Sequence, residues 1–109
     1  MTGSLNGNVR EWLGIPFAQP PVGDLRWEPP QPLEGFAHVQ ATVMPPACMQ
    51  AVRKNEGLYG NVTDYQYLIA GPISEDCLTL SIWAPEQASK SLPVLVYIHG
   101  GALDRKSVV

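Results

Sequence analysis

The most constraining feature of the sequence is an uninterrupted run of apolar residues close to its end. Residues 92–98 read LPVLVYI, with no charged side chain among them. A strand with one wet face alternates apolar and polar residues, whereas a run without alternation is typical of a strand covered on both faces of its sheet. The sequence therefore predicts a central strand at residues 92–98, as in α/β folds.

Two consecutive glycines follow this predicted strand. His99, Gly100 and Gly101 would lie at the carboxyl edge of the sheet, where open α/β folds bind their ligands. Glycine allows positive φ and close approach, so consecutive backbone N–H groups can converge on one oxygen. That arrangement is an oxyanion hole, which stabilises the charge formed on a carbonyl oxygen under nucleophilic attack. On this segment alone, a simple strand-terminating turn with a structural His99 is the alternative.

A proline-rich segment precedes these elements. Six prolines lie between Ile15 and Leu33, which excludes a long helix or a central strand because proline lacks a donor N–H and biases its predecessor toward extended conformations. Large apolar residues are interleaved with the prolines, and a flexible linker, the alternative, has no use for them. We expect an ordered, irregular, extended segment.

The rest of the chain divides into a loop and a strand. Residues 44–72 carry scattered Gly and Asn that break any period, and residues 65–70 could form a turn of helix or an extended piece. Leu78, Leu80 and Ile82 then alternate with Thr, Ser and Trp, which predicts a strand with one drier face, ended by Pro85. We find no internal repeat, and we expect one domain or part of one.

Composition and charge narrow the classes of function. The net charge of −3 is spread thinly over 109 residues, so nucleic acid is not a favoured partner. No apolar run approaches the ~20 residues that span a bilayer, and the start shows no secretory signal features. Cys48 and Cys77 could be buried thiols or a disulfide, and Asn61 begins an N-glycosylation sequon that could be a chance tripeptide.

Three segments together resemble the type B carboxylesterase and cholinesterase family. Residues 12–33, WLGIPFAQPPVGDLRWEPPQPL, are similar to the family's N-terminal LGIPYA, PPVG and Pro-rich signature. Residues 75–83, EDCLTLSIW, are similar to EDCLYLNVW, and residues 92–103, LPVLVYIHGGAL, to PVMVWIHGGGF. The three motifs occur in the family's order. The resemblance implies the N-terminal part of an α/β-hydrolase fold, with strands, irregular Pro-rich loops and an incomplete sheet.

The resemblance also implies roles for the residues after the predicted strand. Gly101 and Ala102 align with the two residues whose amides help to bind the oxyanion, and Gly100 provides the turn before them. Ala102 replaces the usual third glycine but keeps its N–H. Leu103 replaces the usual Phe, which changes the packing of the loop.

Several structural roles follow from the same resemblance. It implies a disulfide between Cys48 and Cys77 that closes a surface loop carrying Asn61, and a salt bridge between Arg26 and Glu75. A disulfide and a glycosylation site would suit a secreted or otherwise extracytoplasmic full-length protein, although this chain shows no signal peptide.

The catalytic groups of this family are absent from the chain. Hydrolysis by this route needs a G-x-S-x-G serine, an acid and a histidine base, and no G-x-S-x-G occurs here. His38 and His99 are the only histidines, and neither is a good candidate base. We therefore expect a fragment of an esterase that acts on small carboxylic esters without metal or organic cofactor, inactive alone.

Two alternatives to an esterase fragment remain open from the sequence. The chain could belong to an inactive cholinesterase-like adhesion protein, or it could be unable to fold, because its strands lack partners. The last residues, DRKSVV, depart from the Gly-rich, aromatic turn with which the family continues. We expect residues 1–103 to form the N-terminal part of one carboxylesterase domain and residues 104–109 to be a non-native tail.

Overall fold

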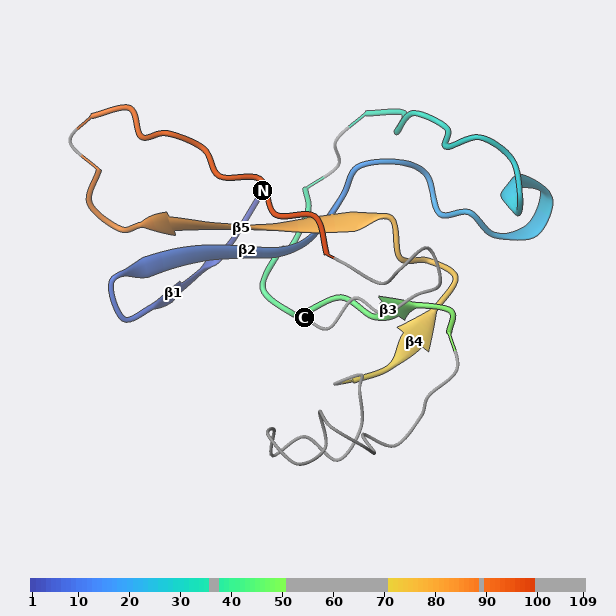
Figure 1. Cartoon of the computed structure of the whole chain (residues 1–109), viewed down its shortest axis with the longest axis horizontal. Helices are drawn as coiled ribbons and strands as arrows, with labels where there is room; N and C mark the ends of the chain where they lie inside the picture. The colour runs from blue at the N-terminus through green and yellow to red at the C-terminus, as the bar shows by residue number, and fades with distance from the viewer. Residues whose placement is uncertain (36–37, 51–70, 89, 100–109) are drawn as a thin grey trace. The chain divides into compact units, whose positions relative to one another are not determined.

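The computed structural model of the chain describes residues 1–35, 38–50, 71–88 and 90–99 (Figure 1). These residues belong to two compact units. The first comprises residues 1–45 and 75–95, and the second comprises residues 46–74 and 96–109. Strands dominate, and one turn of 3-10 helix is the only helix among the described residues.

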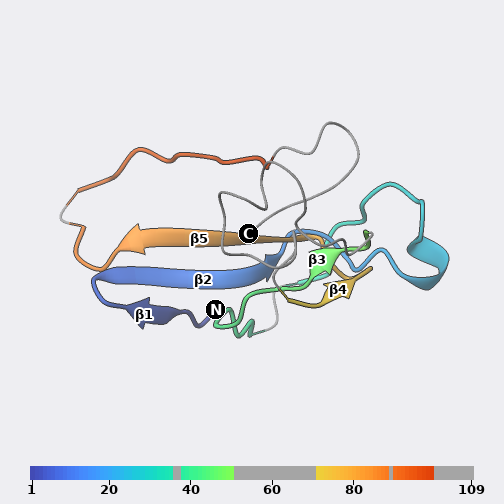
Figure 2. The ribbon, with the colours of Figure 1, turned by 60° about the horizontal axis from the view of Figure 1, so that its bottom comes forward.

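A three-stranded antiparallel sheet forms the first unit (Figures 1 and 2). Its strands are β1 (Ser4–Asn6), β2 (Val9–Pro16) and β5 (Thr79–Pro85), in the order β1-β2-β5. A two-residue turn joins β1 to β2, and Gly7 adopts φ 58 there, a value that glycine reaches without steric cost. The predicted strand that Pro85 ends is confirmed as β5.

β2 carries an irregularity in the middle of its pairing with β5. The register shifts between Trp12 and Ile15, so one strand has an extra residue. Gly14 takes φ 73 at this bulge, and its amide donates to the hydroxyl of Ser81 on β5 at 3.3 Å. The side chain of one strand thus satisfies the N–H group that the bulge removes from the ladder.

Residues 39–42 form isolated parallel bridges with Thr2, just before β1, and with Leu13 in β2. The amide of Leu13 donates to Ala41 O at 2.9 Å, and the amide of Ala41 donates to Thr2 O at 2.7 Å. Ala41 is fully buried, and the other buried apolar residues are Ile15 and Ala18. The described core is therefore small and lies where β2 meets this segment.

The proline-rich segment is ordered and irregular, as predicted. Its first two residues, Ile15 and Pro16, are the end of β2, which corrects the prediction there, and the rest contains the 3-10 turn η1 (Gly23–Leu25) but no strand. Gln19 holds the two ends of the segment together, because its amide donates to Gln31 O and its side chain donates to Pro32 O, both at 2.9 Å. Its polar backbone groups thus find local partners where proline prevents regular structure.

The prediction of a dry face on β5 is wrong for the described residues. Leu80 and Ile82 are 42% and 46% exposed, whereas Thr79 and Ser81, which alternate with them, are more buried. The alternation is present, but no described residue covers the apolar side. The alternation of apolar and polar residues along a strand indicates which face prefers burial. Burial itself needs another layer of the protein to cover that face.

The second unit contains a short parallel pair of strands. β3 (Ala47–Cys48) pairs with β4 (Ile73–Ser74), and the amide of Ala47 donates to Pro72 O at 3.0 Å. Residues 65–70, for which a turn of helix or an extended piece was expected, lie outside the described residues.

The central strand predicted at residues 92–98 is not formed. These residues belong to no strand, and no backbone hydrogen bond joins them to another described residue. Leu95, at the centre of the run, is 93% exposed. A strand buried on both faces needs neighbouring strands and two covering layers, and no described residue pairs with or covers residues 92–98 in this way.

Candidate functional site

The residues expected to bind an oxyanion follow directly after the described chain. Gly100, Gly101 and Ala102 lie outside the described residues, which end at His99. Their role therefore stays a prediction. The other described residues that the sequence singled out have structural roles: Arg26 lies in the proline-rich segment, Cys48 ends β3, and Glu75 and Cys77 follow β4.

Arg26 and Glu75 lie in direct contact. The Nε atom of Arg26 is 2.7 Å from Oε1 of Glu75, which is the length of a strong charge-assisted hydrogen bond. The side chains are 57% and 34% exposed, so water screens the attraction and its contribution to stability is small. The ion pair links the proline-rich segment to the start of the segment that leads into β5, and so it organises the loop more than it stabilises it.

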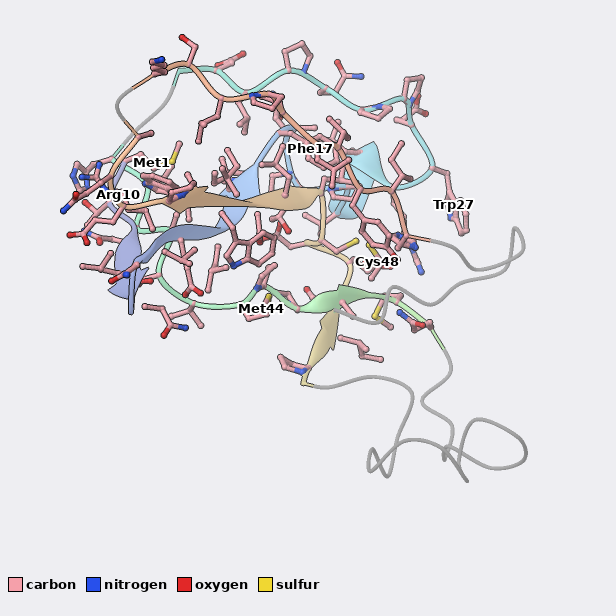
Figure 3. All side chains as sticks on the ribbon, turned by 60° about the vertical axis from the view of Figure 1, so that its left-hand side comes forward. Met1, Arg10, Phe17, Trp27, Met44 and Cys48 are labelled. Carbon is pink, nitrogen blue, oxygen red and sulfur yellow. The ribbon has the colours of Figure 1, made fainter. Side chains whose placement is uncertain are left out.

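Trp27, the residue after this arginine, has an unusual conformation that the sequence did not predict. It is the only described non-glycine residue with positive φ, at 68°, and its side chain is 92% exposed. Figure 3 shows the indole pointing away from the ribbon. The Arg26 guanidinium lies 5.8 Å from the centre of the ring, within the range of a cation–π contact. A bulky residue in this region of φ is a steric outlier, and no sequence signal identifies it.

Both cysteines are disulfide-bonded. They are the two cysteines of the chain, so the bond joins Cys48 at the end of β3 to Cys77 just before β5. The disulfide that the resemblance implied is therefore present. Asn61, in the loop that the bond closes, lies outside the described residues.

A small cavity lies within the proline-rich segment. Its volume is about 150 Å³. Apart from Leu78, which lies just before β5, its lining comes from the proline-rich segment itself. The wall is mostly apolar and consists of Gln19, Pro21, Leu25, Glu28, Pro29, Pro30, Gln31 and Leu78. The space is about that of a benzene-sized cavity, well below an ordinary ligand pocket. Its lining includes no serine, cysteine or histidine, so it provides neither the nucleophile nor the base of a serine esterase.

The described histidine in the body of the first unit has a structural environment. The ring of His38 lies 3.3 Å from Thr2 Oγ1 and 3.5 Å from Gln40 Nε2, at the surface. Neither partner is acidic. A catalytic histidine base is oriented by an acidic side chain, and these contacts do not supply one.

Two kinds of feature are not found in the part of the chain that the structure describes. No group of three His, Cys, Asp or Glu side chains there could hold a metal ion. Among the same residues, no helix has the length and apolar character needed to cross a bilayer.

Sequence relatives of the chain are esterases. A chlorogenic acid esterase from Aspergillus niger is 46% identical over 101 residues, which cover 86% of this chain and 19% of the relative. Carboxylesterase 1F from Mus musculus is 46% identical over 98 residues, or 87% of this chain and 18% of the relative. The chain thus spans about a fifth of the length of these relatives. They give the adhesion alternative no support.

Solved structures and a family model agree with the sequence relatives. A thermophilic PNB esterase matches 95% of this chain and 20% of its own with a TM-score of 0.69 and 37% identity. A second PNB esterase matches 95% of this chain and 19% of its own with a TM-score of 0.70 and 36% identity. The predicted fold class, an incomplete N-terminal portion of an α/β-hydrolase fold, is confirmed. Because the model of the carboxylesterase family matches residues 1–108, the chain belongs to the carboxylesterase family.

Proposed function

We propose that the complete protein hydrolyses small carboxylic esters through an acyl-serine intermediate, and that this chain supplies the oxyanion loop. Membership of the carboxylesterase family, with esterases among its relatives, carries the proposal. A serine oxygen attacks the ester carbonyl, the carbonyl oxygen becomes an oxyanion, and the alcohol leaves. Water then releases the acid from the serine. No cofactor takes part in this route.

The loop acts through its backbone. Gly101 and Ala102 donate their N–H groups to the oxyanion, and Gly100 makes the turn that aims them. Such donors are preorganised, so they stabilise charge without reorganising during the reaction. Ala102 differs from glycine by one methyl group and keeps the donor, so the substitution preserves the function if its φ is one that alanine adopts.

The chain alone is expected to be inactive. It holds no G-x-S-x-G sequence, and the serine, acid and base belong to the rest of the protein. The roughly four-fifths of the relatives' length that the chain does not span is where these groups would lie.

The remaining structural roles concern the full-length protein. The disulfide suits an oxidising compartment, which supports an extracytoplasmic location. Asn61 is proposed to carry an N-linked glycan there. Residues 1–103 are proposed to be the N-terminal part of one catalytic domain, with residues 104–109 as a non-native tail; the family match reaches residue 108, so this boundary depends on the DRKSVV sequence alone.

A chimeric enzyme tests the proposal. Residues 1–103 replace the matching segment of the Aspergillus niger esterase, and turnover of a short-chain nitrophenyl ester is measured. We expect the chimera to be active and Ala102→Pro, which removes one N–H, to lower kcat by about 10²- to 10³-fold.

The matched control is Ala102→Gly, which keeps the N–H and should change kcat by less than about threefold. Circular dichroism establishes that each variant is folded. A folded chimera in which Ala102→Pro is as active as Ala102→Gly would contradict the role of this amide. Turnover by the 109-residue chain itself would contradict the proposal that the serine, acid and base lie in the rest of the protein.

A further inference from the structure

The turn between β1 and β2 contains an Asn-Gly pair, Asn6 and Gly7. Asn6 is the last residue of β1, an edge strand of the sheet, and it pairs with Val9 of β2. Asn6 and Gly7 are both exposed. Among the described residues, the N–H group of Gly7 donates to no backbone acceptor. A primary amide is therefore followed by an exposed backbone nitrogen that the sheet does not use.

We propose that Asn6 is a site of spontaneous deamidation, and that the negative charge formed there loosens the pairing of β1 with β2. The nitrogen of Gly7 attacks Cγ of Asn6, the new N–Cγ bond forms, and the Cγ–Nδ2 bond breaks. The proton of the Gly7 N–H leaves with Nδ2 as ammonia. Water then opens the cyclic imide at one of its two carbonyl carbons, which yields aspartate or isoaspartate. The reaction consumes water alone and involves no change of oxidation state.

The local structure leaves the Gly7 nitrogen open to this reaction. Glycine has no side chain to shield its own nitrogen, and no atom lies within 4 Å of the position that a Cβ of Gly7 would occupy. Attack requires the Asn6 side chain to rotate over the peptide bond that follows it. β1 has three residues and lies at the sheet edge, so it opens locally at a lower free-energy cost than a central strand.

Asn8, in the same turn, is an internal control. It is exposed as well, but its successor is Val9, whose β-branched side chain crowds the backbone nitrogen. Val9 pairs with residues of both neighbouring strands, and the carbonyl of Asn8 accepts from the amide of Glu86 at 2.8 Å. We therefore expect Asn8 to react at least about tenfold more slowly than Asn6, a difference of about 1.4 kcal/mol in barrier.

Glu11 makes the modification consequential for the hairpin. The Nδ2 atom of Asn6 donates to Oε1 of Glu11 at 3.2 Å, diagonally across the β1–β2 pair. Deamidation replaces this donor by a carboxylate oxygen, so a contact that attracted becomes one between like charges. Isoaspartate in addition inserts a methylene group into the backbone of β1, which disturbs the register of its ladder. Both products therefore weaken the same strand pair.

Ageing of the 109-residue chain in neutral buffer tests the site. Peptide mapping by mass spectrometry follows aspartate at each asparagine, and enzymatic methylation of isoaspartate identifies the second product. We expect both products at position 6 and an intact Asn8. The rate in the folded chain should lie within about tenfold of the rate in urea, because the turn does not protect the Gly7 nitrogen. The chimeric enzyme, whose fold is complete, gives the same readout.

Charge variants test the consequence. Asn6→Asp should raise the unfolding equilibrium constant by about two- to fivefold, because an exposed pair of like charges is only modestly unfavourable. In a Glu11→Gln background, which removes the opposing charge, the same substitution should change it by less than about twofold. Urea unfolding followed by circular dichroism measures the four proteins.

Each outcome decides the proposal. If Asn6 stays intact, reacts no faster than Asn8, or reacts more than about tenfold more slowly in the folded protein than in urea, the assignment of the site is overturned. If Asn6→Asp has the same effect in both backgrounds, or none, the repulsion from Glu11 is overturned. Neither result bears on the esterase activity, which depends on residues elsewhere in the protein.

Discussion

β2 and residues 92–98 are both apolar segments, yet their states in the structure are opposite. β2 pairs with a strand on each side and contributes Ile15 to the buried core. Residues 92–98 are more uniformly apolar, but they pair with nothing in the described chain and stay exposed. Hydrophobicity therefore does not decide which segment becomes a strand here. The two segments differ in pairing: β2 has a hydrogen-bonded strand on each side, and residues 92–98 have none among the described residues.

The same apolar truncation in the two segments should have very different effects. Ile15→Ala removes a side chain that is 6% exposed, and we expect it to lower the free energy of unfolding by about 2 to 4 kcal/mol. Ile98→Ala removes one that is 83% exposed and should change it by less than about 0.5 kcal/mol. Urea unfolding at low protein concentration measures both. Equal losses would mean that residues 92–98 are buried in the monomer, and the comparison would fail.

Two glycine-to-alanine substitutions test whether residues 43–45 crowd the bulge in β2. Gly14→Ala must place a methyl group at φ 73, with Val43 O 3.3 Å from the new Cβ, and we expect a loss of about 2 kcal/mol. Gly7→Ala has a similar φ of 58 but meets no atom within 4 Å, so it should cost about 1 kcal/mol. Thermal unfolding followed by circular dichroism compares them. If Gly7→Ala costs as much, crowding by residues 43–45 has no effect at the bulge.

Removing one hydroxyl should give the smallest effect. Ser81→Ala leaves the part-buried amide of Gly14 without its side-chain acceptor, and we expect a loss of about 1 kcal/mol. Ser91→Ala, at an exposed position beside the unpaired segment, should change stability by less than about 0.5 kcal/mol. Chemical denaturation of both variants checks the difference, and an unaffected Ser81→Ala would show that water replaces the hydroxyl.

The sequence predicted the parts of this molecule that depend on local chemistry or on motif order. Proline spacing predicted an irregular ordered loop, alternation predicted β5, and three motifs in order indicated the family. It did not predict the exposure of Leu80 or the unpaired state of Leu95, because periodicity expresses a preference for burial and not the presence of a covering layer. The hydrogen bond between Gly14 and Ser81 joins residues 67 positions apart, and the positive φ of Trp27 has no compositional marker.

The candidate site was predictable to a smaller extent. Gly100, Gly101 and Ala102 could be identified by alignment with a family motif, but the geometry of a donor pair depends on backbone angles that a motif does not specify. The contact between Arg26 and Glu75 was implied only by resemblance, since nothing in the spacing of two residues 49 positions apart indicates that they meet. The cavity in the proline-rich segment had no sequence signal, because cavities depend on how side chains pack.

The disulfide also has a kinetic consequence. β2 and β5 must find one another across the chain from Phe17 to Leu78, and such a long loop is slow to close. A bond between Cys48 and Cys77 bypasses residues 49–76 and nearly halves that loop. Halving a loop lowers the entropic cost of closure by about 0.6 kcal/mol, which corresponds to roughly a two- to threefold faster encounter of the strands. Oxidation before sheet formation therefore shortens the search, and the order of these two events sets how fast the chain folds.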